Sequence, residues 1–288
     1  MPKFQEDAEL LGQQHVAAGT YRMRLVSPQL AAHGRPGQFL LARVVGTSLD
    51  PLLRRPFSFH RLFPDDGIVE ILYKVVGRGT LMLSHCRPGT RINLLGPLGN
   101  GFNLSAERDR PLFLVAGGIG IAPLFAVLDQ ALAAGWDPTR LYLFYGARSA
   151  DELLAAEEFA PLGIPVRWST DDGSQGWHGF VTDLVQNALE GGAVRPGRLY
   201  ACGTLAMQYQ VAKLTVEYGL TAELSLESLM ACGLGACLGC ALPAWHPTDP
   251  DADHYVHVCK HGPIFSPGSI RWQKLQFHRA QPPIFLSS

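Results

Sequence analysis

Residues 227–240 read E-S-L-M-A-C-G-L-G-A-C-L-G-C, and a further cysteine, Cys259, follows after eighteen intervening residues. The spacing is Cys232-x4-Cys237-x2-Cys240 with a distant fourth cysteine. That is the arrangement of plant-type [2Fe–2S] ligation, in which four thiolates converge on two irons. Three ligands come from one tight loop and the fourth returns from elsewhere in the fold. We expect the rest of the chain to be organised around this loop.

Glycines separate the cysteines and make a tight ligand loop possible. They are Gly233, Gly235 and Gly239. Glycine adopts positive φ without a steric penalty, so such a loop can curl closely around a buried inorganic core. Its amides can then point at the sulfurs, and such contacts tune the reduction potential of a cluster. The stretch therefore predicts a [2Fe–2S] site with all four cysteines as ligands.

A zinc ribbon and a set of disulfides are the alternatives to a cluster. Structural zinc usually shows two knuckles of the C-x2-C type, whereas here one knuckle is x4 and the last cysteine stands alone. Disulfides are typical of secreted proteins, and no signal-peptide pattern opens this chain. The cluster is favoured, zinc comes next and disulfides last. The two remaining cysteines, Cys86 and Cys202, have the character of small buried side chains.

Composition excludes several classes of protein. The 288 residues carry a net charge of -1, with 47% hydrophobic and 17% charged side chains. General binders of nucleic acid or of anionic membranes need a strong basic field, which this balance does not supply. No uncharged apolar run reaches the roughly 18 residues of a membrane span. We expect a soluble cytoplasmic protein of about two domains that binds neither nucleic acid nor membrane.

The N-terminal third of the chain reads as all-β. Short runs of β-forming residues recur between Gly and Pro turn signals, from TYRMRLVS (20–27) to RINLLGP (91–97). Several short strands at such spacing predict a small antiparallel barrel or sandwich. LMLSHCR (81–87) is the one segment within it that resembles a helical turn.

From about residue 104 onward, strands and helices alternate. The expected strands are 111–118, 140–147, 165–170 and 198–203, and the expected helices are 122–135, 150–162, 181–192 and 205–219. Such alternation predicts a parallel, doubly wound sheet. A last strand at 222–228 would lead into the cysteine loop, and a hairpin around Tyr255–Cys259 would follow it.

Two segments of the β region have the chemistry of a flavin site. Arg54-Arg55-Pro56-Phe57-Ser58 offers an arginine fork for a pyrophosphate and a hydroxyl for a flavin ring. Leu72 to Thr80 reads L-Y-K-V-V-G-R-G-T, where glycines precede a helical turn whose amides suit a phosphate. Either segment alone has an ordinary alternative, because Arg and Ser are common in strands and Thr80 would serve as a plain helix cap.

Two segments of the α/β region suit a dinucleotide. Residues 116–123 read A-G-G-I-G-I-A-P between a strand and a helix, where Gly118 and Gly120 would let a pyrophosphate approach the backbone. Pro123 replaces the third glycine of the usual fingerprint and suits an early helix position. Cys202-Gly203-Thr204 ends a later strand at the sheet edge where ligands bind, and Cys202 would lie near a nicotinamide ring there. The alternatives are a tight turn and a packing cysteine.

These motifs occur in a familiar order: R-P-F-S (55–58), L-Y-K-V-V-G-R-G-T (72–80), G-P-L-G-N-G-F (96–102), A-G-G-I-G-I-A-P (116–123), C-G-T (202–204) and the cysteine loop. In this the chain resembles the ferredoxin-NADP reductase-like superfamily. Within it, the cysteine loop followed by V-C-K-H-G-P-I-F resembles the electron-transfer subunit of NAD-linked, two-subunit dihydroorotate dehydrogenase. The resemblance runs from about residue 10 to about residue 272.

The resemblance implies three parts: an antiparallel flavin-binding β-barrel (1–103), a doubly wound parallel α/β NAD-binding domain (104–222) and a small C-terminal [2Fe–2S] module (223–288). The residues that match FAD-binding segments are Arg55, Pro56, Phe57, Ser58, Leu72, Tyr73, Lys74, Gly79 and Thr80. The cluster ligands would be Cys232, Cys237, Cys240 and Cys259. The expected nucleotide-binding set is Gly117, Gly118, Gly120, Pro123, Cys202 and Gly203.

The resemblance also implies a function. An FMN-containing catalytic subunit would oxidise dihydroorotate, in a heterotetramer with two copies of each chain. Electrons would pass from that FMN through the [2Fe–2S] cluster to FAD and then to NAD, as a step of pyrimidine (UMP) biosynthesis. Because the cofactors perform the chemistry, we expect no indispensable acid–base residue on this chain. The chain departs from the family pattern at its C-terminus, which continues from Lys274 to Ser288.

Two other functions remain open on the sequence. Related flavin and iron–sulfur subunits serve NADH-dependent ferredoxin:NADP oxidoreductases and sulfide dehydrogenases. Ligation by four cysteines favours the dihydroorotate reading, because some of those relatives carry a ligand other than cysteine. A binding module without enzymatic activity, stabilised by zinc on a reductase fold, is the alternative from a different class.

Overall fold

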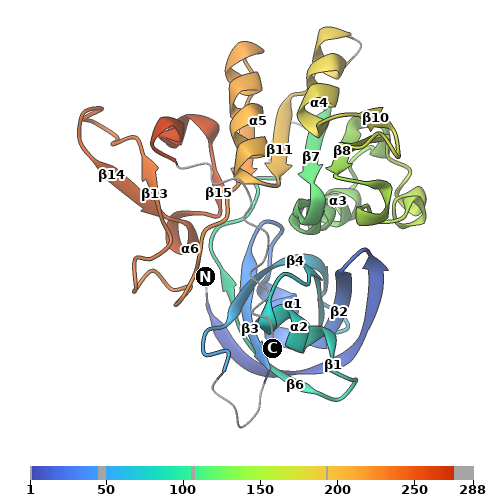
Figure 1. Ribbon diagram of the computed structural model, residues 1–288, viewed down its shortest axis with the longest axis vertical. Coiled ribbons are helices and arrows are strands. Elements are labelled where there is room, and N and C mark those ends of the chain that lie inside the picture. Colours follow the sequence, from blue (N-terminus) through green and yellow to red (C-terminus); the bar gives the residue numbers. More distant parts are fainter. Residues whose placement is uncertain (1, 45–49, 105–107, 193, 276–288) are drawn as a thin grey trace.

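The computed structural model of this chain describes residues 2–44, 50–104, 108–192 and 194–275 (Figure 1). Six of its strands close an antiparallel barrel in the order β1-β2-β5-β4-β3-β6. They are β1 (Phe4–Ala17), β2 (Thr20–Val26), β3 (Phe39–Val44), β4 (Arg55–Phe63), β5 (Ile68–Lys74) and β6 (Arg91–Leu98). The predicted all-β region is thus confirmed as a barrel, and β1 begins well before the first strand expected from the sequence.

Side chains alternate between the inside and the outside of the barrel. On β5, Val69, Ile71 and Tyr73 belong to the barrel core, whereas Leu72 packs outward into a second core. Two short helices join the strands, α1 (Pro28–His33) and α2 (Arg78–Ser84). Helix α1 was not expected, although a proline at its first position is a usual start signal. The helical turn expected at 81–87 corresponds to α2, which begins three residues earlier.

Seven strands form the second sheet, in the order β10-β9-β8-β7-β11-β12-β15. They are β7 (Leu112–Gly117), β8 (Leu141–Ala147), β9 (Val166–Thr170), β10 (Trp177–His178), β11 (Arg198–Cys202), β12 (Ala222–Ser225) and β15 (Ile264–Phe265). Only the β12–β15 pair is antiparallel among these neighbours. The predicted parallel, doubly wound sheet is confirmed.

Helices cover both faces of this sheet (Figure 1). They are α3 (Ile121–Ala133) on one face, and α4 (Val181–Glu190) with α5 (Leu205–Glu217) on the other. Alternate residues of β7 follow this division, because Leu114 packs with α3 and Val115 packs with α4 and α5. Helix α3 also contacts β4 of the barrel, so it lies between the two sheets.

The helix expected over 150–162 is wrong. The segment forms three single 3-10 turns, η3 (Ala150–Glu152), η4 (Ala156–Glu158) and η5 (Ala160–Leu162). The carbonyl of Asp151 accepts a hydrogen bond of 2.8 Å from the amide of Ala18 in the barrel, so this carbonyl is engaged outside the segment. Pro161 removes a donor, and Gly163 follows in the left-handed conformation. The segment contacts the barrel and does not form a continuous helix.

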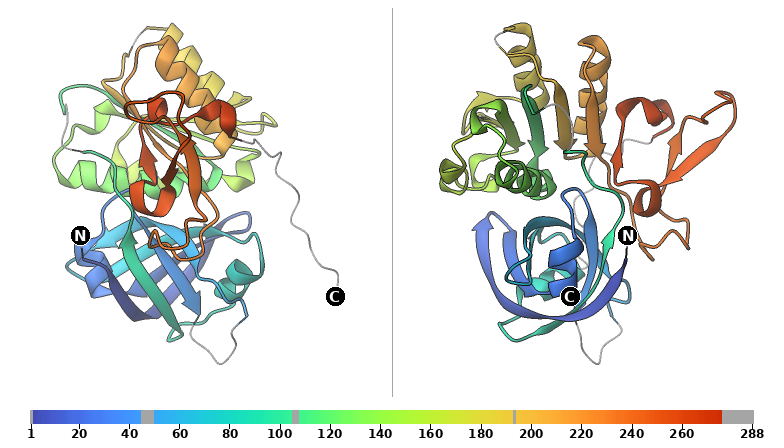
Figure 2. Two further views of the ribbon diagram at one scale, coloured as in Figure 1. Left: turned by 90° about the vertical axis from the view of Figure 1, so that its left-hand side faces the viewer. Right: turned by 180° about the vertical axis from the view of Figure 1, so that it is seen from behind.

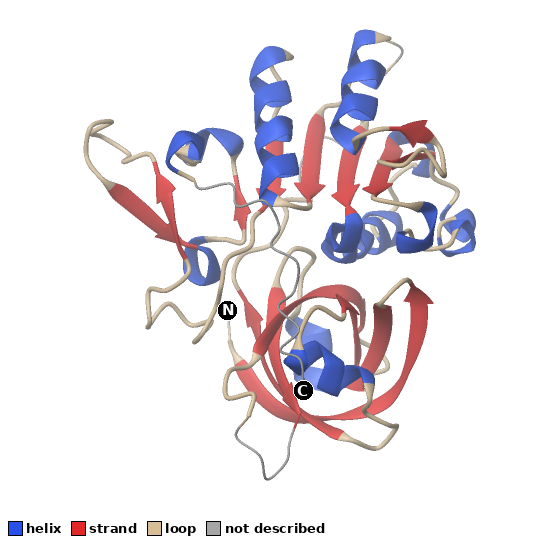
Figure 3. Ribbon diagram, in the orientation of Figure 1, coloured by secondary structure: helices blue, strands red, loops and turns tan. Residues whose placement is uncertain are grey.

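The cysteine-rich part lies beside both larger parts (Figures 2 and 3). Its hairpin consists of β13 (Ala241–Ala244) and β14 (His254–His257), and helix α6 (Val258–His261) follows. A hairpin was predicted here, but Cys259 lies on α6 and not on the second strand. Strand β15 then returns to the main sheet. The other 3-10 turns are η1 (Gly118–Gly120), η2 (Pro138–Arg140), η6 (Pro267–Ser269) and η7 (Trp272–Lys274).

Two further sequence expectations concern membrane-spanning segments and the C-terminal extension. Among the described helices, none combines the length and the apolar composition that a bilayer crossing requires. The C-terminal extension was singled out from Lys274 onward, and its residues 276–288 lie outside the described part of the chain.

Candidate functional site

The four cysteines of the predicted cluster come from two elements that meet. Cys232, Cys237 and Cys240 belong to the loop between β12 and β13, and Cys259 lies on α6. The sulfurs of Cys240 and Cys259 are 3.2 Å apart, and both side chains are buried. Cys232 is half-buried and Cys237 is exposed. All four are free thiols, which excludes disulfides among them.

Backbone amides of the loop point at these sulfurs. The amides of Leu234 and Cys237 each donate to Cys232 Sγ over 3.4 Å, and the amide of Gly235 donates to Cys259 Sγ over 3.2 Å. Gly233 and Gly235 have φ of 67° and 79°, as the tight loop requires. Amides that face sulfur stabilise thiolates, so the loop fits an iron–sulfur cluster.

The pKa values of two cysteines respond to this setting. Burial alone would raise the pKa of Cys232, but hydrogen bonds from backbone amides outweigh it and lower the pKa to about 6. Burial and the neighbouring Cys240 raise the pKa of Cys259 to about 12. Positive metal ions would favour its thiolate. In the described chain no three His, Cys, Asp or Glu side chains surround a single-ion position, so the fit rests on the sulfur pair and the amides.

The cysteine loop rests directly on the barrel. A side-chain carbon on Gly233 would lie 2.6 Å from the end of the Leu41 side chain of β3, and the φ of 67° at this position favours glycine. Buried Cys240 and Cys259 share one hydrophobic core with Leu41. Asn100, just after β6, fixes the other side of the module, because its side chain donates to the carbonyls of His261 and Ile264 over 3.0 and 2.9 Å.

The predicted phosphate site of the flavin brings Arg55 and Gly79 together. A side-chain carbon on Gly79 would lie 2.6 Å from Nε of Arg55, so the guanidinium passes directly over this glycine. The Thr80 hydroxyl accepts from the amides of Val76 and Gly77 over 3.0 and 3.2 Å. It therefore caps α2, which leaves the backbone amides of the first turn to meet a phosphate.

The other predicted flavin residues lie on both sides of the barrel wall. Phe57 and Tyr73 point into the barrel core, with ring centroids 5.6 Å apart. Ser58 and Leu72 alternate with them and face outward, where Leu72 meets the core around α3. Pro56 opens β4 between Arg55 and Phe57 and is exposed. The outer face of β4 at Pro56 and Ser58 is thus the side available to a flavin ring, because Leu72 on the outer face of β5 is covered by the core around α3.

Gln13 holds the predicted flavin segments together. Its side-chain oxygen accepts from the Tyr73 hydroxyl over 2.8 Å. Its side-chain nitrogen donates to three carbonyls at the end of α2, those of Leu83, Ser84 and Cys86. Burial raises the pKa of Tyr73, so this hydroxyl stays protonated and keeps its hydrogen bond.

Lys74 makes a contact that the sequence did not predict. Its Nζ lies 3.1 Å from Oε2 of Glu152, on the turn that follows β8. The other carboxylate oxygen of Glu152 pairs with Arg148. Burial would raise the pKa of Glu152, but the hydrogen bonds from Arg148 and Lys74 outweigh it and lower the pKa. Glu152 thus links the predicted flavin strand to the edge of the nucleotide-binding sheet.

The predicted nucleotide turn brings the ends of β7 and β11 together. A side-chain carbon on Gly120 would overlap the carbonyl oxygen of Cys202. Gly117 and Gly203 face each other across the same gap and both lie against the sulfur of Met207. Gly118, with φ of 52°, has open space where a side chain would be, so a phosphate can approach its backbone.

Pro123 and Cys202 complete the nucleotide set. Pro123 is buried in the first turn of α3, where its missing N–H leaves no unpaired donor. Burial raises the pKa of Cys202 to about 12, so its side chain is a neutral thiol at neutral pH. A neutral thiol is a packing partner and not a nucleophile.

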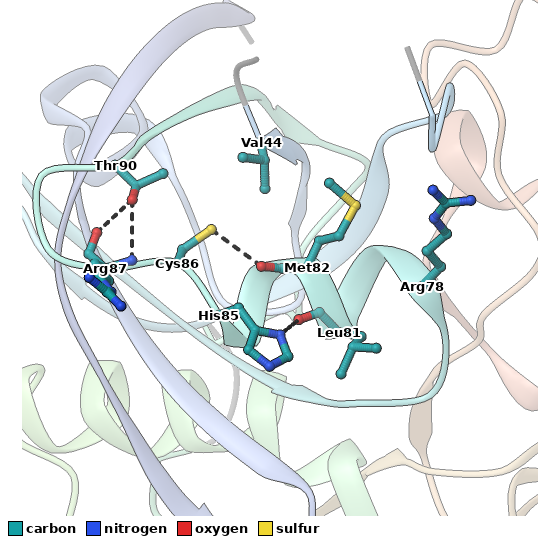
Figure 4. A pocket seen from close by; sticks show the side chains of 8 residues that line it. All are labelled: Val44, Arg78, Leu81, Met82, His85, Cys86, Arg87 and Thr90. Carbon is teal, nitrogen blue, oxygen red and sulfur yellow. Dashed lines mark hydrogen bonds between the residues drawn. The ribbon is translucent and has the colours of Figure 1, made fainter. Parts of the chain in front are cut away.

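A hollow beside α2 adjoins the predicted phosphate site, because Arg78 and Leu81, which line it, flank Gly79 and Thr80 (Figure 4). It has a volume of about 610 Å³ and is formed by α2, the end of β3 and the turn after α2. The residues that line it are Val44, Arg78, Leu81, Met82, His85, Cys86, Arg87 and Thr90. None of the predicted site residues belongs to this set.

Three structural contributors to the site were missed from the sequence. Gln13 and Glu152 gave no signal, since single polar residues on a strand and in a supposed helix are unremarkable. Asn100 stood within the motif G-P-L-G-N-G-F, and a polar side chain between two glycines was the available hint. Contacts between distant segments decide all three roles.

Two protein-family models match this chain. Residues 227–271 match the iron–sulfur cluster binding domain of dihydroorotate dehydrogenase B. Residues 114–213 match the oxidoreductase NAD-binding domain. These matches confirm the predicted iron–sulfur cluster over zinc, and they confirm the predicted nicotinamide dinucleotide.

Several solved structures share the fold. A structure of NADH-dependent reduced ferredoxin-NADP oxidoreductase has a TM-score of 0.80 at 27% identity and covers 94% of this chain and 91% of its own. The ferredoxin reductase of carbazole 1,9a-dioxygenase has a TM-score of 0.65 at 22% identity and covers 76% of this chain and 67% of its own. The first structure, described as flavin-based, supports FAD as the third cofactor, and both structures confirm the predicted fold class.

Curated relatives extend over nearly the whole chain. Electron transfer subunits of dihydroorotate dehydrogenase B (NAD(+)) match at 37% identity in Desulforamulus reducens, covering 93% of this chain and 98% of the relative. The subunit from Lysinibacillus sphaericus matches at 36% identity, covering 92% and 98%. Together with the cysteine module and the nucleotide-binding sheet, these relatives establish that the chain belongs to the family of electron transfer subunits of NAD(+)-linked dihydroorotate dehydrogenase B.

Proposed function

We propose that this chain carries electrons from a subunit that oxidises dihydroorotate to NAD, in pyrimidine (UMP) biosynthesis. The observation that carries the proposal is the serial order of the three candidate sites. The cysteine loop packs on barrel strand β3 through Gly233 and Leu41. The outer face of the barrel packs on α3 through Leu72. A cluster, a flavin and a nicotinamide dinucleotide held at these places would be consecutive neighbours.

Each set of side chains has its own task in this proposal. When bound, the cluster would supply one-electron transfer, FAD would supply both one-electron and two-electron transfer, and NAD would accept an electron pair as hydride. The four cysteines hold the cluster, and their surrounding amides favour the thiolate state. Arg55 and the first-turn amides of α2 hold the FAD pyrophosphate. The glycine turn at 117–120 holds the NAD pyrophosphate at the carboxyl edge of the sheet.

The partner is inferred to be an FMN-containing catalytic subunit, with two copies of each chain in the complex. The name of the relatives, electron transfer subunit, supports a catalytic partner. The side chains between the cluster ligands of this chain support the cysteine loop as the surface that contacts this partner. Leu234 and Leu238 are 43% and 57% exposed and flank Ala236 at the outer end of the loop. Exposed apolar side chains beside a redox centre suit a protein interface.

A cytoplasmic location follows from the same proposal. The six cysteines are free thiols, as expected of a protein in a reducing compartment. NAD as the electron acceptor is available there.

A second function is supported by the structural comparison. The NADH-dependent reduced ferredoxin-NADP oxidoreductase has a similar fold over 94% of this chain. The relatives named for dihydroorotate dehydrogenase B have higher sequence identity, 37% against 27%, and support the first function more strongly.

Replacing Cys237 with Ser tests the proposal. The purified parent chain should show flavin and iron–sulfur absorption, and NADH should reduce its flavin. With a dihydroorotate-oxidising partner added, the parent should reduce NAD in the presence of dihydroorotate. Cys237→Ser should lose the cluster absorption and the dihydroorotate-dependent reduction of NAD, while NADH still reduces the flavin, because only the relay is interrupted.

Cys86→Ser is the matched control, since Cys86 lies near the end of α2 and is no cluster ligand. It should retain both activities. Full dihydroorotate-dependent turnover in Cys237→Ser would contradict the relay. A colourless parent protein that contains zinc and no flavin would overturn electron transfer altogether.

A further inference from the structure

A bulge in barrel strand β4 aims His60 at the nucleotide-binding part. Phe59 pairs with Ile71 and Arg61 pairs with the adjacent Glu70, so His60 is an extra residue without a partner in the ladder. Bulges redirect side chains and are frequent next to active sites. The His60 ring lies 4.7 Å from the ring of Phe125 on α3. It leaves the barrel core and enters the interface.

One ring nitrogen of His60 faces the first turn of α3. Its Nδ1 lies 3.4 Å from the carbonyl oxygen of Ala122, two residues after Gly120 of the glycine turn. A carbonyl only accepts hydrogen bonds, so Nδ1 must carry the hydrogen in this contact. The residue thereby joins strand β4, which begins with the predicted flavin segment, to the predicted nucleotide turn.

The other ring nitrogen faces a buried acid. Nε2 lies 3.7 Å from Oε1 of Glu70, and within the described residues neither atom has a hydrogen-bond partner. His60 is 0% exposed and Glu70 is 5% exposed, so solvent does not screen the contact. With the hydrogen on Nδ1, a neutral ring would turn a lone pair toward a carboxylate. The two atoms attract each other only when a proton lies between them.

Charged groups on β2, β4 and α3 surround the pair. They are Arg22 and Arg24 of β2, Arg61 of β4 and Asp129 of α3. Arg61 pairs with Asp129 over 2.6 Å and Arg24 lies 3.8 Å from Glu70. This ring of mostly positive charge opposes a second proton on the pair.

Burial acts on both groups in a way that favours one proton. It lowers the pKa of His60 to about 3, so the ring resists a positive charge of its own. It raises the pKa of Glu70, so the carboxyl resists losing its proton. Besides the hydrogen on Nδ1, the state with no proton between His60 and Glu70 and the state with a proton on each of them are both disfavoured.

We propose that His60 and Glu70 hold one proton between them and act as a positioning pair that fixes the flavin-binding strand β4 against the first turn of α3. The pair keeps the barrel and the nucleotide turn in register, so that flavin and nicotinamide meet in a geometry that permits hydride transfer. This inference rests on the proposed function. Neither side chain touches the reacting atoms.

The first test needs neither substrate nor variant. In the flavin-loaded protein labelled with ¹⁵N at histidine, the His60 ring should carry a slowly exchanging hydrogen on Nδ1 at pH 7. Its signals should not follow the ordinary histidine titration near pH 6.5. A His60 ring that titrates like a surface histidine would overturn the shared proton, whatever the protein's activity.

The second test follows flavin reduction by NADH in stopped flow. His60→Leu should lower the rate constant at saturating NADH on the order of tenfold, because small misplacements of reacting groups have effects of this size or larger. The NADH concentration for half-maximal rate should change little, because the glycine turn is intact. Glu9→Gln is the control for Glu70→Gln, because it makes the same acid-to-amide change in an exposed ion pair with Arg91. It should leave both the rate constant and the half-maximal NADH concentration unchanged.

The pH dependence separates positioning from ordinary packing. The parent should lose rate as rising pH removes the shared proton. Glu70→Gln keeps its amide hydrogens at every pH and should not show this alkaline loss. Identical pH profiles of the parent and Glu70→Gln would overturn the proposal. A parent whose flavin NADH does not reduce would instead refute the proposed function, and the labelled histidine would still report on the pair.

Discussion

At the scale of single residues, Arg55 shows how one side chain defines a binding site. Its guanidinium passes over Gly79, in the first turn of α2, and donates a hydrogen bond to the carbonyl of Leu53. A phosphate there would meet a positive charge and backbone amides together. Arg55→Ala should weaken FAD binding by about 1.5–3 kcal/mol, the usual contribution of a charge-assisted hydrogen bond. Flavin content after gel filtration measures this loss.

The control for this prediction is Arg91→Ala. Arg91 lies on β6 of the same barrel, is largely exposed and pairs with Glu9 on the surface. It should retain its full flavin content. Equal flavin content in both variants would remove Arg55 from the proposed FAD site.

Residue types constrain the cluster site more tightly than the flavin site. Four cysteines at fixed spacing have few alternative explanations, and the structure brings their loop and α6 together. Thr80 and Tyr73 have several alternative explanations. In the structure the Thr80 hydroxyl caps α2 and the Tyr73 ring packs in the barrel core. The direction of a side chain depends on strand register, which cannot be read from the sequence of a motif.

At the scale of elements, the turn between β7 and α3 depends on close approach to the end of β11. A side-chain carbon on Gly120 would overlap the backbone oxygen of Cys202, which cannot rotate away. Gly120→Ala should therefore displace the turn, at a cost of about 1–3 kcal/mol for overpacking. The affinity for NADH, measured by titration of the oxidised protein with an unreactive NADH analogue, should fall.

Gly268→Ala is the matched control, because a side-chain carbon there meets no atom within 4 Å. It should bind the analogue like the parent. Unaltered affinity in Gly120→Ala would show that the turn tolerates the displacement.

Elements were predictable wherever local pattern and tertiary contacts agreed. Short apolar runs predicted most strands of both sheets, but not β1, β10 and β15, and the alternation of strands and helices predicted α3, α4 and α5. The segment 150–162 has helix-forming composition, yet its Asp151 carbonyl and its Glu152 and Glu158 side chains bind the barrel. The His60 bulge is equally invisible in the sequence, because one extra residue changes no local propensity.

At the scale of the whole molecule, ion pairs hold the barrel and the nucleotide-binding part in place. Arg22 pairs with Glu158 over 2.6 Å and Lys74 with Glu152 over 3.1 Å. Glu152→Gln should lower the stability of the interface on the order of 1 kcal/mol. The midpoint of thermal unfolding at pH 7 should fall accordingly.

The pH dependence of this effect has a definite sign. The pKa of Glu152 in the folded protein is lowered from its ordinary value of 4.5. Its stabilisation is therefore present above that value and is lost as the pH falls through the lowered pKa. The difference between the parent and Glu152→Gln should shrink on acidification. Glu157→Gln, an exposed neighbour, should match the parent at every pH, and a constant gap would contradict the ion pair.

We propose that the catalytic subunit contacts the outer end of the cysteine loop. Leu238 has φ of 60°, and among the described residues it is the single non-glycine residue with positive φ. A leucine held in this conformation is strained, and strained residues cluster at functional sites. Its side chain is 57% exposed. The loop therefore maintains an unfavourable backbone while presenting an apolar side chain between two cluster ligands.

Leu238→Asp should weaken association with the catalytic subunit by about 2 kcal/mol or more, because an interface centre tolerates an unpaired charge poorly. Aspartate also adopts positive φ more readily than leucine, so the loop should still form. Cluster absorption should stay intact while the complex dissociates in analytical ultracentrifugation. Val216→Asp, on α5 and 83% exposed, introduces the same charge away from the cluster and should leave the complex intact. If both variants associate like the parent, the partner approaches the cluster from another side.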